Sequence, residues 1–169
     1  ANCLATPWND LKNIKEIIIE EGVTTIGEAA FCDSDSLTSI TISNSVISIG
    51  HRAFLDCDSL TSIIIPSSVT SIGSEAFAGC FSLTSIDMPN SVTSIGNAAF
   101  SNCNGLTSIV IPSSVTSISQ GAFYDCSSLI SIVSNAMTAP TIQSDTFQFV
   151  GADGTLTVPS GSSGYDTWM

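Results

Sequence analysis

The same residue types recur every 23 residues along most of the chain. The stretch that shows the repeat most fully is LTSIIIPSSVTSIGSEAFAGCFS, residues 60–82. Several columns align without a gap, among them Leu37, Leu60, Leu83, Leu106 and Leu129; Ile40, Ile63, Ile86, Ile109 and Ile132; Phe31, Phe54, Phe77, Phe100 and Phe123; and Cys57, Cys80, Cys103 and Cys126. A fixed period of this length predicts a solenoid, in which each coil covers the apolar face of its neighbour.

Each coil begins with a short alternating pattern. Ile40 and Ile42 alternate with Ser39 and Thr41, which predicts a strand with the isoleucines facing inward. Stacking such strands gives a parallel sheet. Val46 and Ile49 are three residues apart, which breaks the strand period and predicts a corner or a short extended segment. The segment SEAFAGC predicts a single helical or 3₁₀ turn, so the fold is mostly β and irregular.

The repeat also predicts how the chain is divided. Residues 1–169 form one domain, with a partial coil or cap over 1–13, about five coils over 14–133, and a degenerate coil and cap over 134–169. Trp8 falls in the column of Phe31 and is expected to cover the N-terminal core. Ile142 falls one residue late, so one insertion lies between Ile132 and Ile142.

Charge excludes several classes of partner. The net charge is −12, and Lys12, Lys15 and Arg52 are the only cations. Nucleic acid needs clustered Lys and Arg, so no nucleic-acid partner is expected. No apolar run approaches 18 residues, so no direct membrane insertion is expected, and these residues contain no secretory leader pattern.

The six cysteines could suggest disulfides. Cys57, Cys80, Cys103 and Cys126 share one column and point side by side into the core, which favours a ladder of buried thiols instead. Cys3 and Cys32 lie outside this column, and we expect both to be free thiols. The sequence therefore predicts no disulfide.

The chain offers little for catalysis. His51 is its only histidine and stands in a variable polar column, so we expect an exposed bystander and no enzyme. No cofactor motif is present.

One weak metal site remains as an alternative. Asp33, Asp35, Asp56 and Asp58 pair on adjacent coils and could hold Ca²⁺, although a solvated turn edge built from good turn formers is the simpler interpretation.

A binding face is the better candidate. The outward strand positions form one serine column and one variable column, which consists of Thr41, Ile64, Asp87, Val110 and Val133. The apolar members either contact a ligand or reflect ordinary β-propensity on a sheet surface. Phe81 and Tyr124 are further candidate contact residues at the turn edge.

The pattern LxxIxIPxSVxxIGxxAFxxC closely resembles the Treponema pallidum-type leucine-rich repeat of BspA-like surface proteins. The resemblance covers Ile14 to Phe147. It implies a right-handed leucine-rich-repeat solenoid that is secreted or attached to the bacterial cell surface. It further implies an adhesion module, here expected to be monomeric, that binds an extracellular or host protein. A structural spacer within a longer surface protein is the alternative.

Overall fold

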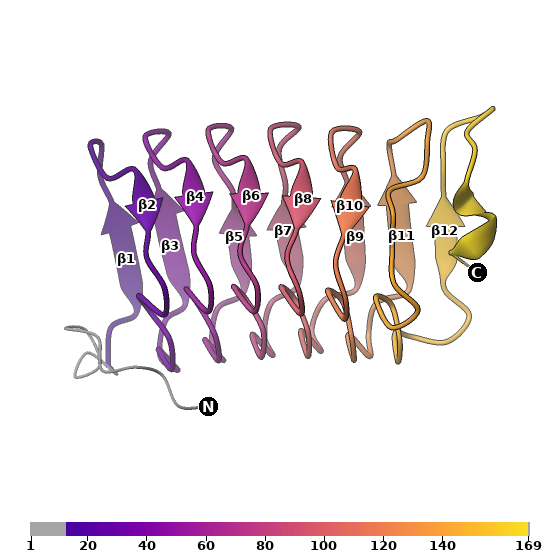
Figure 1. Ribbon diagram of the computed structural model, residues 1–169. Helices are drawn as coiled ribbons and strands as arrows, with labels where there is room; N and C mark the ends of the chain where they lie inside the picture. The colour runs from indigo at the N-terminus through magenta and orange to yellow at the C-terminus, as the bar shows by residue number, and fades with distance from the viewer. Residues whose placement is uncertain (1–12, 169) are drawn as a thin grey trace.

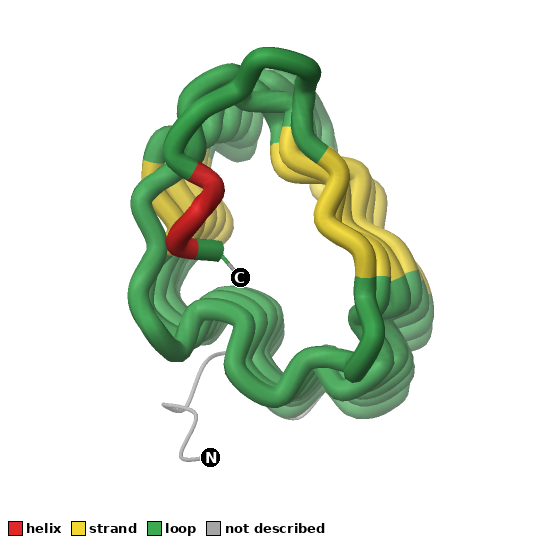
Figure 2. Tube along the Cα trace, turned by 90° about the vertical axis from the view of Figure 1, so that its right-hand side faces the viewer, coloured by secondary structure: helices red, strands yellow, loops and turns green. Residues whose placement is uncertain are grey.

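The computed structural model describes residues 13–168, and these form a stack of coils that rises evenly along one axis (Figure 1). Viewed along the stack, successive coils lie almost directly behind one another (Figure 2). The predicted parallel β-solenoid is therefore confirmed. Trp8 and Cys3, for which the sequence made predictions, lie outside the described residues.

One side of the stack carries the strands predicted from the alternating pattern. They are β1 (Glu16–Ile19), β3 (Ser39–Ile42), β5 (Ser62–Ile64), β7 (Ser85–Asp87), β9 (Ser108–Ile111), β11 (Ser131–Ser134) and β12 (Thr155–Thr157). Paired strands are parallel and keep the 23-residue register, as in Ile17 with Ile40 and Ile109 with Ile132, except that β11 and β12 pair 24 residues apart. We call the outward surface of these seven strands the strand face.

A second parallel sheet lies on the opposite side of the stack (Figure 2). Its strands have two residues each, and their spatial order is β2 (Thr25–Ile26), β4 (Ser48–Ile49), β6 (Ser71–Ile72), β8 (Ser94–Ile95) and β10 (Ser117–Ile118). This confirms the short extended segment predicted near Ile49. The strands of the strand face are divided among three small parallel sheets, β1-β3, β5-β7 and β9-β11-β12, and the core lies between them and the second sheet.

The segment predicted as a single helical or 3₁₀ turn has a different structure, and this prediction is corrected. Residues 74–79 form consecutive turns, in which alternate amides donate to the next coil, as Phe77 N does to Ala99 O at 2.8 Å. The intervening amides make long i to i−3 bonds within the coil, as Ala78 N does to Glu75 O at 3.3 Å. Half of the amides are thus unavailable to a helix. The one helix of the described residues is the 3₁₀ helix η1 (Tyr165–Thr167).

Phenylalanine and cysteine build two continuous columns in the core. Neighbouring rings from Phe31 to Phe147 stack with centroids 5.2 to 5.5 Å apart. The four column thiols, which we call the thiol ladder, are free and buried. Each thiol donates to a phenylalanine carbonyl of the preceding coil, as Cys103 Sγ does to Phe77 O at 3.2 Å. The ladder therefore joins successive coils as well as filling space.

Cys32 departs from the prediction. It was expected to be a free thiol, but it is disulfide-bonded. Cys32 is buried against Ala29, Leu55 and Ala78, in a small cluster separate from the main core. The argument for free thiols in the ladder, that its cysteines share one column of the repeat, does not apply to Cys32, which lies outside that column. The expectation of no disulfide is therefore wrong.

Aromatic residues cover the C-terminal end of the core. The Trp168 ring lies 5.4 Å from the Phe147 ring and 5.1 Å from the Tyr165 ring. Trp168 Nε1 donates to Pro140 O at 3.2 Å, and Tyr165 Oη donates to Ala136 O at 2.9 Å. These contacts hold η1 over the last coil. Among the described residues, none of the helical structure is long and apolar enough to cross a membrane.

Candidate functional site

The strand face brings the predicted variable column together in one line. Strand register places Ile64 beside Asp87, and Val110 beside Val133. Ile64 is 68% exposed and Val110 is 49% exposed, while Thr41 and Asp87 are also exposed. Val133, by contrast, is half-buried. Large aliphatic side chains are thus exposed to solvent at positions where threonine, which also favours strands, would fit equally well.

The neighbouring column makes these side chains protrude. Its members are serines, namely Ser39, Ser62, Ser85, Ser108 and Ser131, of which the first four are exposed. A serine is much smaller than isoleucine, so an incoming partner meets the aliphatic side chains first. Hydroxyl groups beside them offer hydrogen bonds to that partner.

The charge of the strand face is negative. Glu16 and Asp87 are exposed, and no Lys or Arg occupies an outward position of the described strands. Ile18 also belongs to this face, because it pairs with Thr41 in register, and it is 63% exposed. Our sequence interpretation missed Ile18, although the 23-residue step places it directly in the variable column.

The two aromatic candidates lie elsewhere. Phe81 is 48% exposed and Tyr124 is half-buried, and both belong to turns outside the strands. The Tyr124 ring meets the Phe149 ring edge to face, with centroids 5.2 Å apart. Our sequence interpretation also missed Phe149. These aromatics form a separate exposed edge, not part of the strand face.

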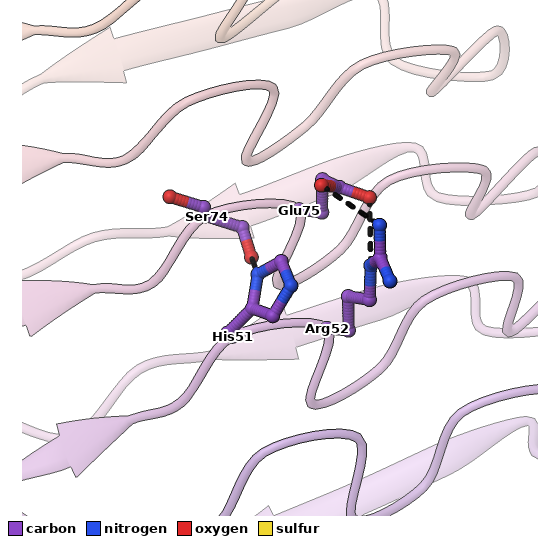
Figure 3. Close-up of polar contacts among 4 residues, drawn as sticks. All are labelled: His51, Arg52, Ser74 and Glu75. Atoms are coloured by element: carbon purple, nitrogen blue, oxygen red, sulfur yellow. Dashed lines mark hydrogen bonds and ion pairs between the residues drawn. The ribbon is translucent and has the colours of Figure 1, made fainter. Parts of the chain in front are cut away.

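His51 has a structural role. Its Nδ1 lies 2.9 Å from the backbone carbonyl of Ser74, one coil further along (Figure 3). Beside it, Arg52 Nε and Nη2 donate to the Glu75 carboxylate at 2.9 and 3.3 Å (Figure 3). The hydrogen bond to Glu75 raises the pKa of Arg52. Both contacts tie adjacent coils, and neither pairs His51 with a nucleophile.

The four aspartates of the weak calcium site face a turn edge. Asp33 and Asp56 have left-handed backbones, with φ of 56° each, which suits aspartate in turns. Burial, and then the nearby charge of Asp33, raises the pKa of Asp56; burial, and then Asp35, raises the pKa of Asp58. Within the described residues, no group of three or more acidic, histidine or cysteine side chains is arranged to hold a metal ion.

Comparison with protein families gives one match, described as "BspA type Leucine rich repeat region". It occurs in six copies that cover residues 8–130 and 48–162. The match therefore extends over most of the chain, including every strand of the strand face. A search of curated proteins gave no match.

Solved structures with a similar fold come from several bacteria. A leucine-rich repeat protein of Treponema pallidum is 28% identical over 85% of this chain and 72% of its own, with a TM-score of 0.69. A leucine-rich repeat protein of Eubacterium ventriosum is 26% identical over 92% of this chain and 45% of its own, with a TM-score of 0.67. One from Bacteroides ovatus is 32% identical over 72% of this chain, with a TM-score of 0.55. This chain spans only 38% of the Bacteroides ovatus chain.

Proposed function

The chain belongs to the BspA-type leucine-rich repeat family, and on this premise we propose that it is a protein-binding module of the bacterial cell surface or of a secreted bacterial protein. Repeats of this family typically form non-catalytic binding scaffolds. The observation that carries the proposal is the line of exposed aliphatic side chains on the strand face. Ile18 and Ile64 are 63% and 68% exposed at positions where a polar strand former would fold as well.

The expected affinity is modest. Burying one large aliphatic side chain contributes about 1.5 to 3 kcal/mol. Three such side chains give a gross gain of roughly 5 to 9 kcal/mol, against an association cost of about 4 to 15 kcal/mol. Hydrogen bonds to the serine column must supply the remainder. We therefore expect micromolar binding by one face, which several linked copies would strengthen.

Two features support a location outside the cytoplasm. Cys32 is disulfide-bonded, and disulfides persist mainly in oxidising compartments. The chain also has no Lys or Arg after Arg52, so trypsin-like proteases find no site over the last 117 residues. A secreted or surface-attached protein would benefit from both properties.

The test is binding to a panel of purified extracellular-matrix and bacterial surface proteins. The variant carries Ile64→Asp and Val110→Asp, which leave the core columns unchanged. The matched control is Ile47→Asp, since Ile47 is 54% exposed but lies outside the strand face. We expect the double variant to lose a partner that the wild type and the control both bind. If no panel protein binds, or if the control loses the partner equally, a structural spacer becomes the better explanation.

A further inference from the structure

Tyr124 and Phe149 form an aromatic pair on adjacent coils, outside the strands. Their rings meet at an interplanar angle of 83°, with centroids 5.2 Å apart. Phe149 is 58% exposed and Tyr124 is half-buried. Neither ring belongs to the phenylalanine column of the core, which runs from Phe31 to Phe147. The pair therefore leaves aromatic surface open to solvent.

The backbone at Phe149 is unusual for an aromatic residue, because its φ of 62° lies in the left-handed region. Asp125 N donates to Gln148 O as Gly79 N does to Ser101 O, so Asp125 and Phe149 hold equivalent positions on adjacent coils. The earlier members of this column are also left-handed, and all are residue types that suit turns: Asp33, Asp56, Gly79, Asn102 and Asp125. A bulky side chain is an outlier at such a φ. Folding alone gives no reason for a phenylalanine here, whereas contact with a partner does.

A carboxylate lies next to the aromatic pair. Asp125 follows Tyr124 in the chain and precedes Phe149 by one coil in its column, where stacked core rings give a coil repeat of 5.3 Å. Asp125 is half-buried and takes part in no ion pair with the described residues. The chain has no Lys or Arg after Arg52 that could neutralise it. Aromatic surface and an uncompensated negative charge thus occur side by side.

These two features together select the chemistry of the partner. A neutral group on the rings would take water away from the Asp125 carboxylate without replacing it, which costs free energy. An anion would be repelled by this carboxylate and by the net charge of −12. A cation is attracted both by the carboxylate and by an aromatic face within about 6 Å. Of the protein cations, the planar guanidinium of arginine suits both contacts best, because it stacks on rings and donates to carboxylates as a fork.

Resting on the proposed function, we propose that Tyr124, Asp125 and Phe149 bind an arginine side chain of the partner protein. The guanidinium lies against the Phe149 ring and donates to the Asp125 carboxylate. Tyr124 supports the Phe149 ring from the side through their edge-to-face contact. This contact uses none of the aliphatic side chains of the strand face, so each contact can be removed without the other.

The probe is N-acetylarginine amide, titrated into the whole chain and followed by NMR through the ring signals of Tyr124 and Phe149. The citrulline analogue keeps the shape without the charge, and the lysine analogue keeps the charge without the planar fork. We expect saturable shifts of both rings with the arginine compound and no saturation with the citrulline compound. Binding of the lysine compound should be about threefold weaker.

Two variants remove the proposed contacts, and two matched variants serve as controls. Phe149→Asn and Asp125→Asn should each weaken binding of the arginine compound about fivefold, which corresponds to about 1 kcal/mol. Binding is read from the Tyr124 ring in both. Ile47→Asn removes another exposed apolar side chain, and Glu16→Gln removes another exposed carboxylate. Neither control should change the binding.

Phe149→Asn also separates binding from a structural role, because asparagine suits a left-handed backbone. The variant should keep or raise the thermal midpoint while it loses binding. A lowered midpoint with unchanged binding would show that the ring is structural and would overturn the inference. The same holds for a lack of saturable shifts, for equal binding of the arginine and citrulline compounds, and for equal losses from the control variants.

The protein panel separates failure of this inference from failure of the proposed function. If a panel protein depends on Ile64 and Val110 while the arginine compound does not bind, the proposed function stands and the arginine site is wrong. If the arginine compound binds as expected while no panel protein does, the arginine site stands and the proposed function fails. If neither binds, both proposals fail.

Discussion

At the scale of single residues, three thiols of the ladder, Cys57, Cys103 and Cys126, have a raised pKa and so hold their protons more tightly than cysteines of the unfolded chain do. A hydrogen bond with the Cys80 side chain, and then burial, raises the pKa of Cys57. Burial raises the pKa of Cys103, and it raises the pKa of Cys126 to about 12. Since an unfolded cysteine titrates near pH ~8.5, this stabilisation is complete below that pH and is lost as the pH rises towards 12.

We therefore expect the free energy of unfolding in urea to fall between pH 8 and pH 10.5. Cys126→Ser should reduce that fall, because a serine hydroxyl does not titrate in this range and can still donate to Phe100 O. The serine variant is compared with wild type at both pH values, so that other titrating groups contribute equally. An identical fall in the two proteins would contradict this account.

The cysteines should also differ in reactivity. Iodoacetamide should leave the ladder thiols of the folded protein unmodified, since they are buried. Unfolding without a reductant should expose them to the reagent, whereas Cys32 should react only after reduction. Mass spectrometry of peptides from each condition tests this. Modification of Cys32 without reduction would show that its disulfide does not form.

Asp58 is a residue whose charge opposes folding. Its Oδ1 is buried without a hydrogen-bond partner, and burial followed by the charge of Asp35 raises its pKa. A raised carboxyl pKa gives stability that is full below about pH 3.9 and is lost as the pH rises through the folded-state pKa. Asp58→Asn should therefore raise the thermal midpoint at pH 7 and reduce the gain seen on acidification to pH 4.5. Exposed Asp153 provides the control, because Asp153→Asn should change neither.

At the scale of elements, close backbone contact between coils explains the glycines that follow the second-sheet strands β2, β4, β6 and β8; Ser119 follows β10. A Cβ at Gly73 would lie 2.6 Å from the Gly50 carbonyl carbon, which neither backbone can avoid without shifting. Gly73→Ala should therefore destabilise the fold by about 1 to 3 kcal/mol, as overpacking does. Gly27 begins the column and has nothing within 4 Å of the same position. Gly27→Ala should be neutral or slightly stabilising in urea unfolding, and equal losses at both sites would disprove the contact.

The turn segments show where element prediction failed. The inward spacing of Ala76 and Phe77 was correct, and both are fully buried. A single helical or 3₁₀ turn was predicted there, because the local spacing of residues says nothing about the hydrogen-bond partner of each amide. In the folded stack, Glu75, Phe77 and Gly79 donate to the following coil instead. The left-handed φ of 55° at Glu75 is a consequence of that pairing, and nothing in its side chain indicates it.

At the scale of the whole molecule, each coil contacts only its neighbours, so stability should vary along the stack. Trp168 covers the last ring of the phenylalanine column, Phe147, at 5.4 Å. Trp168→Ala should speed hydrogen exchange of the amides in β12 and β11 and leave those in β7 and β8 nearly unchanged. Exchange followed by mass spectrometry measures this directly. Uniform acceleration along all coils would show that the solenoid unfolds as one unit instead.

The sequence by itself determined the repeat, its register and the identity of the core, because each column must face the same column of the next coil. The same register predicted the line of Thr41, Ile64 and Asp87 on the strand face. Only the tertiary structure decided how much of each side chain is exposed, as the half-buried Val133 and Tyr124 show, since exposure depends on which segments pack nearby. It also decided the turn geometry and the bonded state of Cys32, because those depend on which groups of other segments lie within reach.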